Sequence, residues 1–109
     1  MEHDIANRDG ATVVSFKGDV DLESSPMARK ILLDQVDQTP VLLVDMSEVG
    51  YIDSSGIASL VESFQTGRAK GKRFALVNVS EPALRVLQLA RLDKVFEIHA
   101  TVEDALRKG

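Results

Sequence analysis

The chain has 109 residues, of which 44% are hydrophobic, and this length and composition suit one globular domain, which we expect to span residues 1–109. Its 13 Lys and Arg residues are outnumbered by 17 Asp and Glu residues, and no basic strip interleaved with aromatics is present, which argues against nucleic-acid binding. The absence of cysteine excludes a disulfide framework, a thiol nucleophile and a thiolate metal site.

The first third of the chain predicts a β-hairpin followed by a helix. The segments Ile5–Arg8 and Thr12–Lys17 flank Asp9-Gly10, a dipeptide that suits the positive φ angles of a tight hairpin turn. The first segment is short and polar, as expected of a strand at a sheet edge. Gly18–Asp21 then interrupts the pattern, and the Ser25-Pro26 pair predicts a helix start with the serine as N-cap. Apolar residues follow at helical spacing: Ala28, Ile31, Leu32 and Val36.

The middle of the chain predicts a buried strand, a polar turn and a long helix. The aliphatic run Val41–Val44 leads to Tyr51-Ile52 and is typical of a strand covered on both faces. The turn Asp53–Gly56 follows, and a helix is expected from about Ser55 to Lys70, with Gly71 as its stop. Its inward residues recur at i, i+3, i+4 and i+7: Ile57, Leu60, Val61 and Phe64.

The last third predicts two further strands and two shorter helices. Phe74–Val79 is typical of a buried strand, and Ser80 is expected to cap a helix with Pro82 in its first turn. Val95–Ile98 is a short strand candidate, and Thr101–Asp104 resembles a capping box for a terminal helix that ends at about Arg107. The expected inward residues of the third helix are Ala83, Val86, Leu87 and Ala90.

The resulting order of elements predicts an α/β fold. Strands that alternate with helices require right-handed crossovers and a largely parallel sheet, to which the hairpin adds an antiparallel edge. We therefore expect a mixed, mostly parallel sheet of four or five strands, with an N-terminal β-hairpin and about four helices.

The turn Asp53–Gly56 carries the most informative chemistry. At a helix start, unpaired N–H groups and the positive end of the helix dipole favour negative charge. A serine at 54 or 55 could be a nucleophile, a phosphoacceptor or an N-cap. The nucleophile interpretation is weak, because the turn is not G-x-S-x-G and neither His3 nor His99 is placed by the sequence as a base. From spacing alone the cap interpretation is favoured, since Ser and Asp commonly precede helices.

Other polar residues do not predict a metal or catalytic site. Asp19 and Asp21 are close in sequence, but no third oxygen ligand is evident, so we expect both carboxylates to be solvated. His3 and His99 lack a partner at metal-ligand spacing and are expected to be surface or strand residues. We expect no metal, no cofactor and no catalytic activity.

The chain resembles the STAS domain family over essentially all its residues, and within it the anti-sigma factor antagonists of bacteria. The resemblance rests on the hairpin, on Gly18-Asp19-Val20-Asp21, on Asp53-Ser54-Ser55-Gly56-Ile57 after the third strand, and on the Gly71-Lys72 turn. In that family, an anti-sigma factor that is also a serine kinase phosphorylates the serine directly after the aspartate. The unmodified antagonist binds the anti-sigma factor and frees the sigma factor, the phosphorylated form lets go, and a phosphatase resets it.

Carried onto this sequence, the resemblance implies phosphorylation of Ser54, with Ser55 as the second candidate. Asp21 matches an acidic loop position near the phosphoserine, although it could equally turn the chain toward the first helix. Gly56 is expected to let the partner approach closely, or simply to relieve crowding in the turn. The implied partner-binding residues are Asp21, Asp53, Ser54, Ser55, Gly56 and Ile57.

One departure from the family pattern leaves a second function open. Many antagonists have Gly-Leu-Gly after the hydroxyl turn, whereas this chain has Gly56-Ile57-Ala58. A small aliphatic residue at that place is common in accessory subunits of phospholipid-trafficking ABC transporters, whose STAS domain docks on the ATPase. The intact serine pair favours the phosphorylated branch instead.

The partners follow from the leading hypothesis. We expect an anti-sigma factor with serine kinase activity and a phosphoserine phosphatase, with no direct contact to nucleic acid. The polar N-terminus does not resemble a signal peptide and the longest apolar stretch is far too short to span a bilayer, so we expect a cytoplasmic protein without direct membrane contact. A monomer is the simplest expectation for the free protein.

Overall fold

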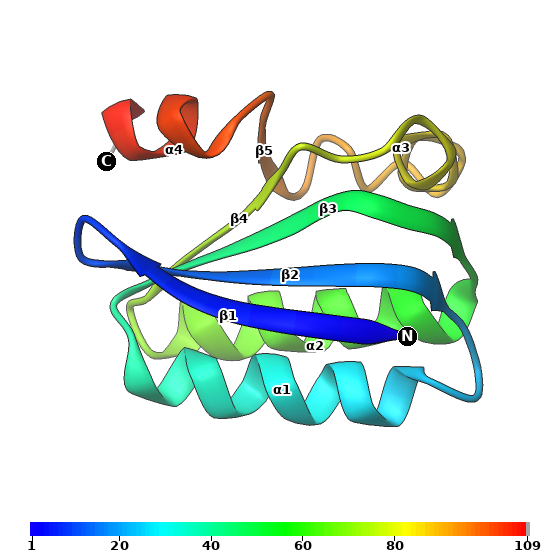
Figure 1. Ribbon diagram of the computed structural model, residues 1–109, viewed down its shortest axis with the longest axis horizontal. Coiled ribbons are helices and arrows are strands. Elements are labelled where there is room, and N and C mark those ends of the chain that lie inside the picture. Colours follow the sequence, from blue (N-terminus) through cyan, green and yellow to red (C-terminus); the bar gives the residue numbers. More distant parts are fainter. Residues whose placement is uncertain (109) are drawn as a thin grey trace.

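The computed structural model describes residues 1–108, so Gly109, the end of the expected domain, lies outside the described residues. Nine elements follow one another in the order expected from the sequence (Figure 1). The strands are β1 (Glu2–Arg8), β2 (Ala11–Val20), β3 (Val41–Ile52), β4 (Arg73–Val77) and β5 (Glu97–His99). The helices are α1 (Ser25–Gln38), α2 (Ser54–Ala69), α3 (Glu81–Leu89) and α4 (Val102–Lys108). The predicted α/β class is confirmed.

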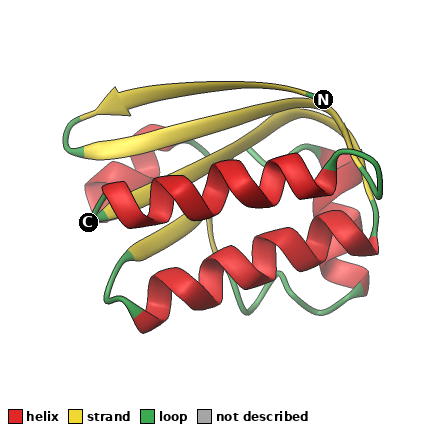
Figure 2. Cartoon of the chain, turned by 90° about the horizontal axis from the view of Figure 1, so that it is seen from below, coloured by secondary structure: helices red, strands yellow, loops and turns green. Residues whose placement is uncertain are grey.

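The five strands form one sheet in the order β1-β2-β3-β4-β5. β1 pairs with β2 in the antiparallel direction, and the β2–β3, β3–β4 and β4–β5 pairs are all parallel. The predicted hairpin edge and parallel sheet are therefore both confirmed. α1 and α2 cover one side of the sheet and α3 and α4 lie on the other (Figures 1 and 2).

Side chains on the two faces of the sheet pack into two hydrophobic clusters. The larger one joins Val14, Val44 and Leu76 to Leu32 of α1 and Leu60 of α2. The smaller one gathers residues of the opposite strand face with two residues of α4: Ala11, Val13, Leu43, Ala75, Val77, Val102 and Ala105. The strands β3 and β4 are thus buried on both faces, as the aliphatic runs predict.

Three strands are longer than the sequence pattern predicts. β1 begins at Glu2 rather than Ile5, and β3 continues without a break from Val41 to Ile52. β2 spans Ala11–Val20 rather than Thr12–Lys17. Gly18 does not interrupt the chain as expected, because it adopts a φ of 99° within β2, and the pairing shifts register on either side of it. The strand therefore runs on to Val20, which is 3% exposed and pairs with Ile52 at the end of β3. The next residues, Asp21 and Asp53, leave the sheet side by side.

Several boundaries and one core assignment differ from the prediction. α1 begins at Ser25 with Ser24 as N-cap, one residue earlier than expected. β4 ends at Val77, since Asn78 has a φ of 51° and turns the chain toward α3. β5 covers Glu97–His99 rather than Val95–Ile98. Ala90, predicted to face inward, is exposed because α3 ends at Leu89. Ser80 caps α3 as predicted, accepting the Ala83 amide at 3.4 Å. Thr101 accepts the Asp104 amide at 3.0 Å, which is one half of the predicted capping box, while the Asp104 carboxylate contacts Arg107.

The buried face of α2 includes a strip of small residues that the sequence pattern does not reveal. Gly56, Ser59, Ser63 and Gly67 are all buried, alongside the predicted Leu60. The Ser59 hydroxyl donates to the Ser25 carbonyl of α1 at 3.2 Å, and this short contact requires the two helices to lie close together. The strip therefore sets the position of the α2 N-terminus against the start of α1.

Candidate functional site

Asp53 is the N-cap of α2 and holds the turn together. Its Oδ1 accepts hydrogen bonds from the amides of Ser55 and Gly56 at 3.0 and 3.1 Å. Its Oδ2 accepts from the Leu22 amide at 3.0 Å, which ties the loop between β2 and α1 to the start of α2. The hydrogen bond from the Ser55 hydroxyl, followed by that from the Gly56 amide, lowers the pKa of Asp53. The site therefore carries a fixed negative charge at the helix start.

Asp21 organises the neighbouring loop. Its Oδ1 accepts from the amides of Glu23 and Ser24 at 3.1 and 3.0 Å and from the Ser24 hydroxyl at 3.1 Å. The Ser24 amide is the main cause of the lowered pKa of Asp21. These contacts turn the chain toward α1, and the role of Asp21 in binding a partner stays a prediction.

The two serines of the turn differ in what their hydroxyls do. The Ser55 hydroxyl donates to Asp53 Oδ1 at 2.6 Å and is partly buried. Ser54 is the first residue of α2, is exposed, and makes no side-chain hydrogen bond to any of residues 1–108. One serine is thus part of the cap and the other presents a free hydroxyl beside it.

Gly56 is buried, so its lack of a side chain is explained by packing within the chain. A Cβ atom there would lie 2.5 Å from the Val20 carbonyl oxygen and 2.7 Å from Cγ1 of Ile52. The glycine is required by packing of α2 against the ends of β2 and β3, so the crowding explanation accounts for it. Of the remaining expected contact residues, Ile57 is half-buried against the larger core cluster.

The sequence pattern does not predict that two large apolar side chains beside the turn are exposed to solvent. Leu22 is 76% exposed and Tyr51 is 52% exposed. Together with Asp21, Glu23 and Asp53 they line a hollow of about 570 Å³. Leu22 and Tyr51 stand next to polar residues at the ends of elements, where no periodicity distinguishes an exposed apolar residue from a buried one. We call these five residues the Leu22–Tyr51 surface.

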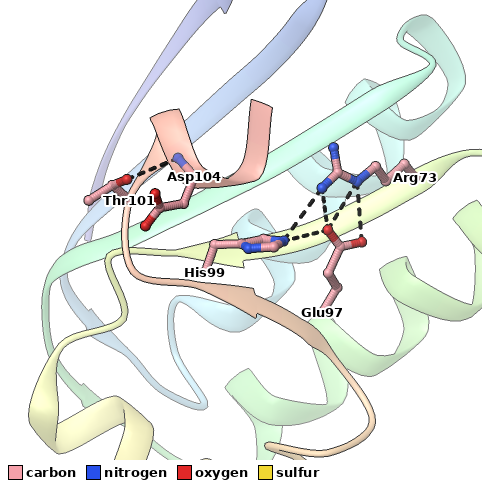
Figure 3. A network of polar contacts seen from close by, with 5 residues as sticks. All are labelled: Arg73, Glu97, His99, Thr101 and Asp104. Atoms are coloured by element: carbon pink, nitrogen blue, oxygen red, sulfur yellow. Dashed lines mark hydrogen bonds and ion pairs between the residues drawn. The ribbon is translucent and has the colours of Figure 1, made fainter. Parts of the chain in front are cut away.

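The two histidines do not contact Ser54 or Ser55 through hydrogen bonds within residues 1–108. His3 is an exposed residue of β1. His99 of β5 approaches Glu97 with its Nε2 at 2.6 Å, and Arg73 of β4 contacts both residues (Figure 3). The hydrogen bond from Arg73 is the main cause of the lowered pKa of Glu97. Within residues 1–108, neither imidazole makes a hydrogen bond to Ser54 or Ser55.

The acidic and histidine side chains of residues 1–108 do not gather into a metal site. No group of three or more His, Asp or Glu side chains in this part of the chain is arranged to hold a metal ion. Asp19 and Asp21 do not form part of such a group. No helix within the same residues is long and apolar enough to cross a membrane.

Comparison with known proteins places nearly the whole chain in one family. The family model described as STAS domain matches residues 3–105. Among curated proteins, the anti-sigma-B factor antagonist of Bacillus subtilis (strain 168) is 26% identical over 104 residues, which cover 95% of each chain. The crystal structure of an anti-sigma factor antagonist from Mycobacterium paratuberculosis matches with a TM-score of 0.88 at 30% identity, over 98% of this chain and 92% of that one.

A more distant structure shares the fold alone. The Bacillus cell fate determinant SpoIIAA in its phosphorylated form matches with a TM-score of 0.73 at 19% identity, over 98% of both chains. The same overall arrangement of helices and strands is thus present in a phosphorylated protein.

Proposed function

Because this chain belongs to the STAS domain family, we propose that it is an anti-sigma factor antagonist switched by phosphorylation of Ser54. The unphosphorylated form binds an anti-sigma factor that is also a serine kinase, and so frees a sigma factor in the cytoplasm. Phosphorylation of Ser54 releases the anti-sigma factor, and a phosphoserine phosphatase restores binding. The observation that carries this proposal is the exposed, unbonded hydroxyl of Ser54 beside the engaged hydroxyl of Ser55.

The position of Ser54 makes a phosphate compatible with the fold. Phosphorylation adds about −1.5 to −2 charges and replaces a hydroxyl that stabilises nothing within the described chain. The N-terminal amides and dipole of α2 favour negative charge at this place. The cap does not depend on Ser54, since Asp53 already accepts the Ser55 and Gly56 amides. The fold of the phosphorylated form is therefore expected to persist.

The same phosphate is poorly compatible with a bound partner. Ser54 adjoins the Leu22–Tyr51 surface, whose apolar side chains supply contact area and whose three carboxylates, Asp21, Glu23 and Asp53, supply negative charge. A phosphate added there introduces bulk, repels these carboxylates, and must be desolvated when the interface closes. Binding is thus expected to weaken without any change of fold.

The serine pair and the relatives favour this function over a lipid-transporter subunit. Ala58, the residue that departs from the family pattern, is exposed on α2. The curated relatives are anti-sigma factor antagonists, a further one being that of Mycobacterium tuberculosis. We therefore retain the phosphorylation switch as the one proposed function.

A binding titration of three variants with the cognate anti-sigma factor tests the proposal. Ser54→Ala is expected to bind as the wild type does, because the lost hydroxyl has no partner in the described chain. Ser54→Asp is expected to bind at least about ten-fold more weakly, since a charge enters the interface. Ser47→Asp adds the same charge at an exposed position in the middle of β3 and serves as the control. Equal affinities of Ser54→Ala and Ser54→Asp would refute the proposal.

A further inference from the structure

The outer edge of β1 is open along its whole length. All seven residues of Glu2–Arg8 are exposed, and within residues 1–108 β1 has only β2 as a neighbour in the sheet (Figure 2). Its pairing with β2 runs without a register shift, and it contains no proline. β1 thus lacks the bulge and the proline that blunt many sheet edges, and its backbone is a regular template for another strand. Its charged side chains, Glu2, Asp4 and Arg8, restrict which strand can pair there.

The hairpin turn fixes which backbone groups point outward. Arg8 and Ala11 close the two-residue turn Asp9-Gly10, whose φ angles of 51° and 85° are those of a type I′ turn. In such a hairpin the pair that closes the turn exchanges hydrogen bonds, and hydrogen-bonded pairs then alternate along the strands. Even-numbered residues of β1 therefore bond to β2, while the N–H and C=O groups of His3, Ile5 and Asn7 face away from the sheet.

We propose that β1 pairs with β1 of a second copy of this chain, antiparallel and centred on Ile5. A two-fold axis at Ile5 places Ile5 opposite its counterpart and His3 opposite Asn7, so that outward-facing backbone groups meet each other. The pairing would join two five-stranded sheets into one continuous sheet. It is an isologous contact, in which the same strand serves both partners.

The charges of β1 are complementary in this register. The axis places Glu2 of each copy directly opposite Arg8 of the other. Asp4 faces Ala6 and lies diagonal both to Arg8 and to Asp4 of the other copy, so the directly facing Glu2–Arg8 pairs carry the complementarity. Opposite charges in directly facing positions of an antiparallel pair are favourable, and like charges are unfavourable. Arg8 also contacts Glu103 at 2.9 Å in its own chain, and the five donors of a guanidinium can serve both carboxylates.

Neighbouring registers are less favourable. A shift of two residues in one direction places Asp4 opposite Asp4 of the other copy. A shift in the other direction keeps an Asp4–Arg8 pair but separates the two Ile5 side chains and leaves fewer residues paired. The self-complementary pattern therefore selects one register rather than allowing strands to slip.

Ile5 provides the apolar contact at the centre. Its side chain is 42% exposed and lies opposite Val14, on the side of the sheet that α1 and α2 cover. Two such side chains would meet at the two-fold axis and cover each other. The contact is one strand pair with a small apolar centre, so we expect a weak dimer in concentration-dependent exchange with the monomer predicted from the sequence.

Sedimentation velocity over roughly a hundred-fold range of protein concentration tests this pairing. The wild-type chain is expected to shift from monomer to dimer as the concentration rises. Glu2→Arg and Arg8→Glu should each raise the dimer dissociation constant about ten-fold or more, because two attractive pairs become repulsive. The double variant Glu2→Arg/Arg8→Glu should restore the wild-type constant, and an equimolar mixture of the two single variants should form heterodimers.

Two controls show whether a loss of dimer comes from the strand pairing itself. Glu103→Gln removes the ion pair of Arg8 within the chain and leaves β1 intact, so it should dimerise as the wild type does. Thermal unfolding of each variant shows whether that variant still folds. A wild-type chain that stays monomeric throughout, or a double variant that fails to regain dimerisation, would overturn the proposal. The pairing uses no residue of the Ser54 site, so its failure would leave the proposed function untouched.

Discussion

At the scale of single residues, two neighbours in the site have different roles: Asp53 caps the helix and Ser54 is the proposed site of modification. Asp53 accepts the amides that open α2 and fixes Leu22, so it is the structural anion of the turn. Ser54 follows it with a hydroxyl that makes no hydrogen bond within residues 1–108, so it can be modified without disturbing the cap. This division explains how a modification site can lie at a helix N-terminus, because the carboxylate of Asp53 and not the hydroxyl of Ser54 caps the helix.

Removal of the cap should destabilise the protein more than removal of the Ser54 hydroxyl. Asp53→Ala leaves the Ser55, Gly56 and Leu22 amides without their acceptor, and is expected to lower the free energy of unfolding clearly. Ser54→Ala is expected to change it by no more than about 0.5 kcal/mol. Urea denaturation of both variants measures the difference. A larger loss for Ser54→Ala would contradict the assignment of the cap.

The same carboxylates should make stability fall in acid. The pKa values of Asp53 and Asp21 lie below the ordinary value of 3.8, so the folded state favours their ionised forms. Their contribution to stability is complete above pH 3.8 and is lost as the pH falls through the lower, folded pKa values. Asp53→Asn should therefore flatten the acid limb of the unfolding free energy measured against pH. An acid limb identical to that of the wild type would show that Asp53 is not responsible.

At the scale of elements, α2 is positioned by small residues rather than by large ones. Gly56 and Gly67 stand at its two ends on the buried face, with Ser59 and Ser63 between them. The sequence predicts the helix and its apolar residues correctly, because Leu60 recurs with Ile57, Val61 and Phe64 at helical spacing. It does not reveal the small-residue strip, because Gly and Ser have no large apolar side chain to mark the buried face of a helix.

The two glycines of α2 should respond oppositely to alanine. Gly56→Ala forces a Cβ within 2.5 Å of the Val20 carbonyl and is expected to destabilise the protein by about 1–3 kcal/mol. Gly67→Ala brings its Cβ no closer than 3.8 Å to its neighbours, and should stabilise the protein by up to about 1 kcal/mol through helix propensity. Denaturation midpoints compare the two variants. Equal effects of the same sign would contradict the close packing assigned to Gly56.

Strand lengths are harder to predict than helices for a related reason. The buried residues of β3 continue beyond Val44 through Met46 and Val49 to Ile52, but polar residues are interspersed among them. A glycine at position 18 normally signals a break, yet its positive φ here accommodates a register shift inside β2. Both extensions depend on pairing between distant segments, which local sequence patterns do not record.

At the scale of the whole molecule, the site lies where two parallel strands end together. Val20 and Ile52 form the last pair between β2 and β3, and the residues that follow them supply Asp21 and Asp53. Open α/β sheets commonly place functional loops at the carboxyl ends of their strands. The sequence and the family resemblance predict the turn itself, whereas the Leu22–Tyr51 surface appears only when the two strand ends are brought together.

A negative charge at position 54 should change the structure only around the start of α2 and the loop that follows β2. Ser54 contributes no hydrogen bond from its side chain within the described chain, so Ser54→Asp is expected to shift backbone amide resonances only near residues 19–27 and 51–58. Two-dimensional NMR spectra of the variant and the wild type measure this. Shifts spread across the sheet and α4 would mean that release of the partner involves a change of fold rather than a local charge.

In the proposed switch, phosphate on Ser54, and not on Ser55, releases the anti-sigma factor. The most direct test of this switch is to incubate the wild type and Ser54→Ala with ATP and the cognate kinase, map the phosphate by mass spectrometry, and titrate each product with the anti-sigma factor. We expect one phosphate on wild-type Ser54, none on Ser54→Ala, and weakened binding only for the phosphorylated protein. Phosphate on Ser55 alone would contradict the site, and unchanged affinity of protein phosphorylated at Ser54 would contradict the mechanism.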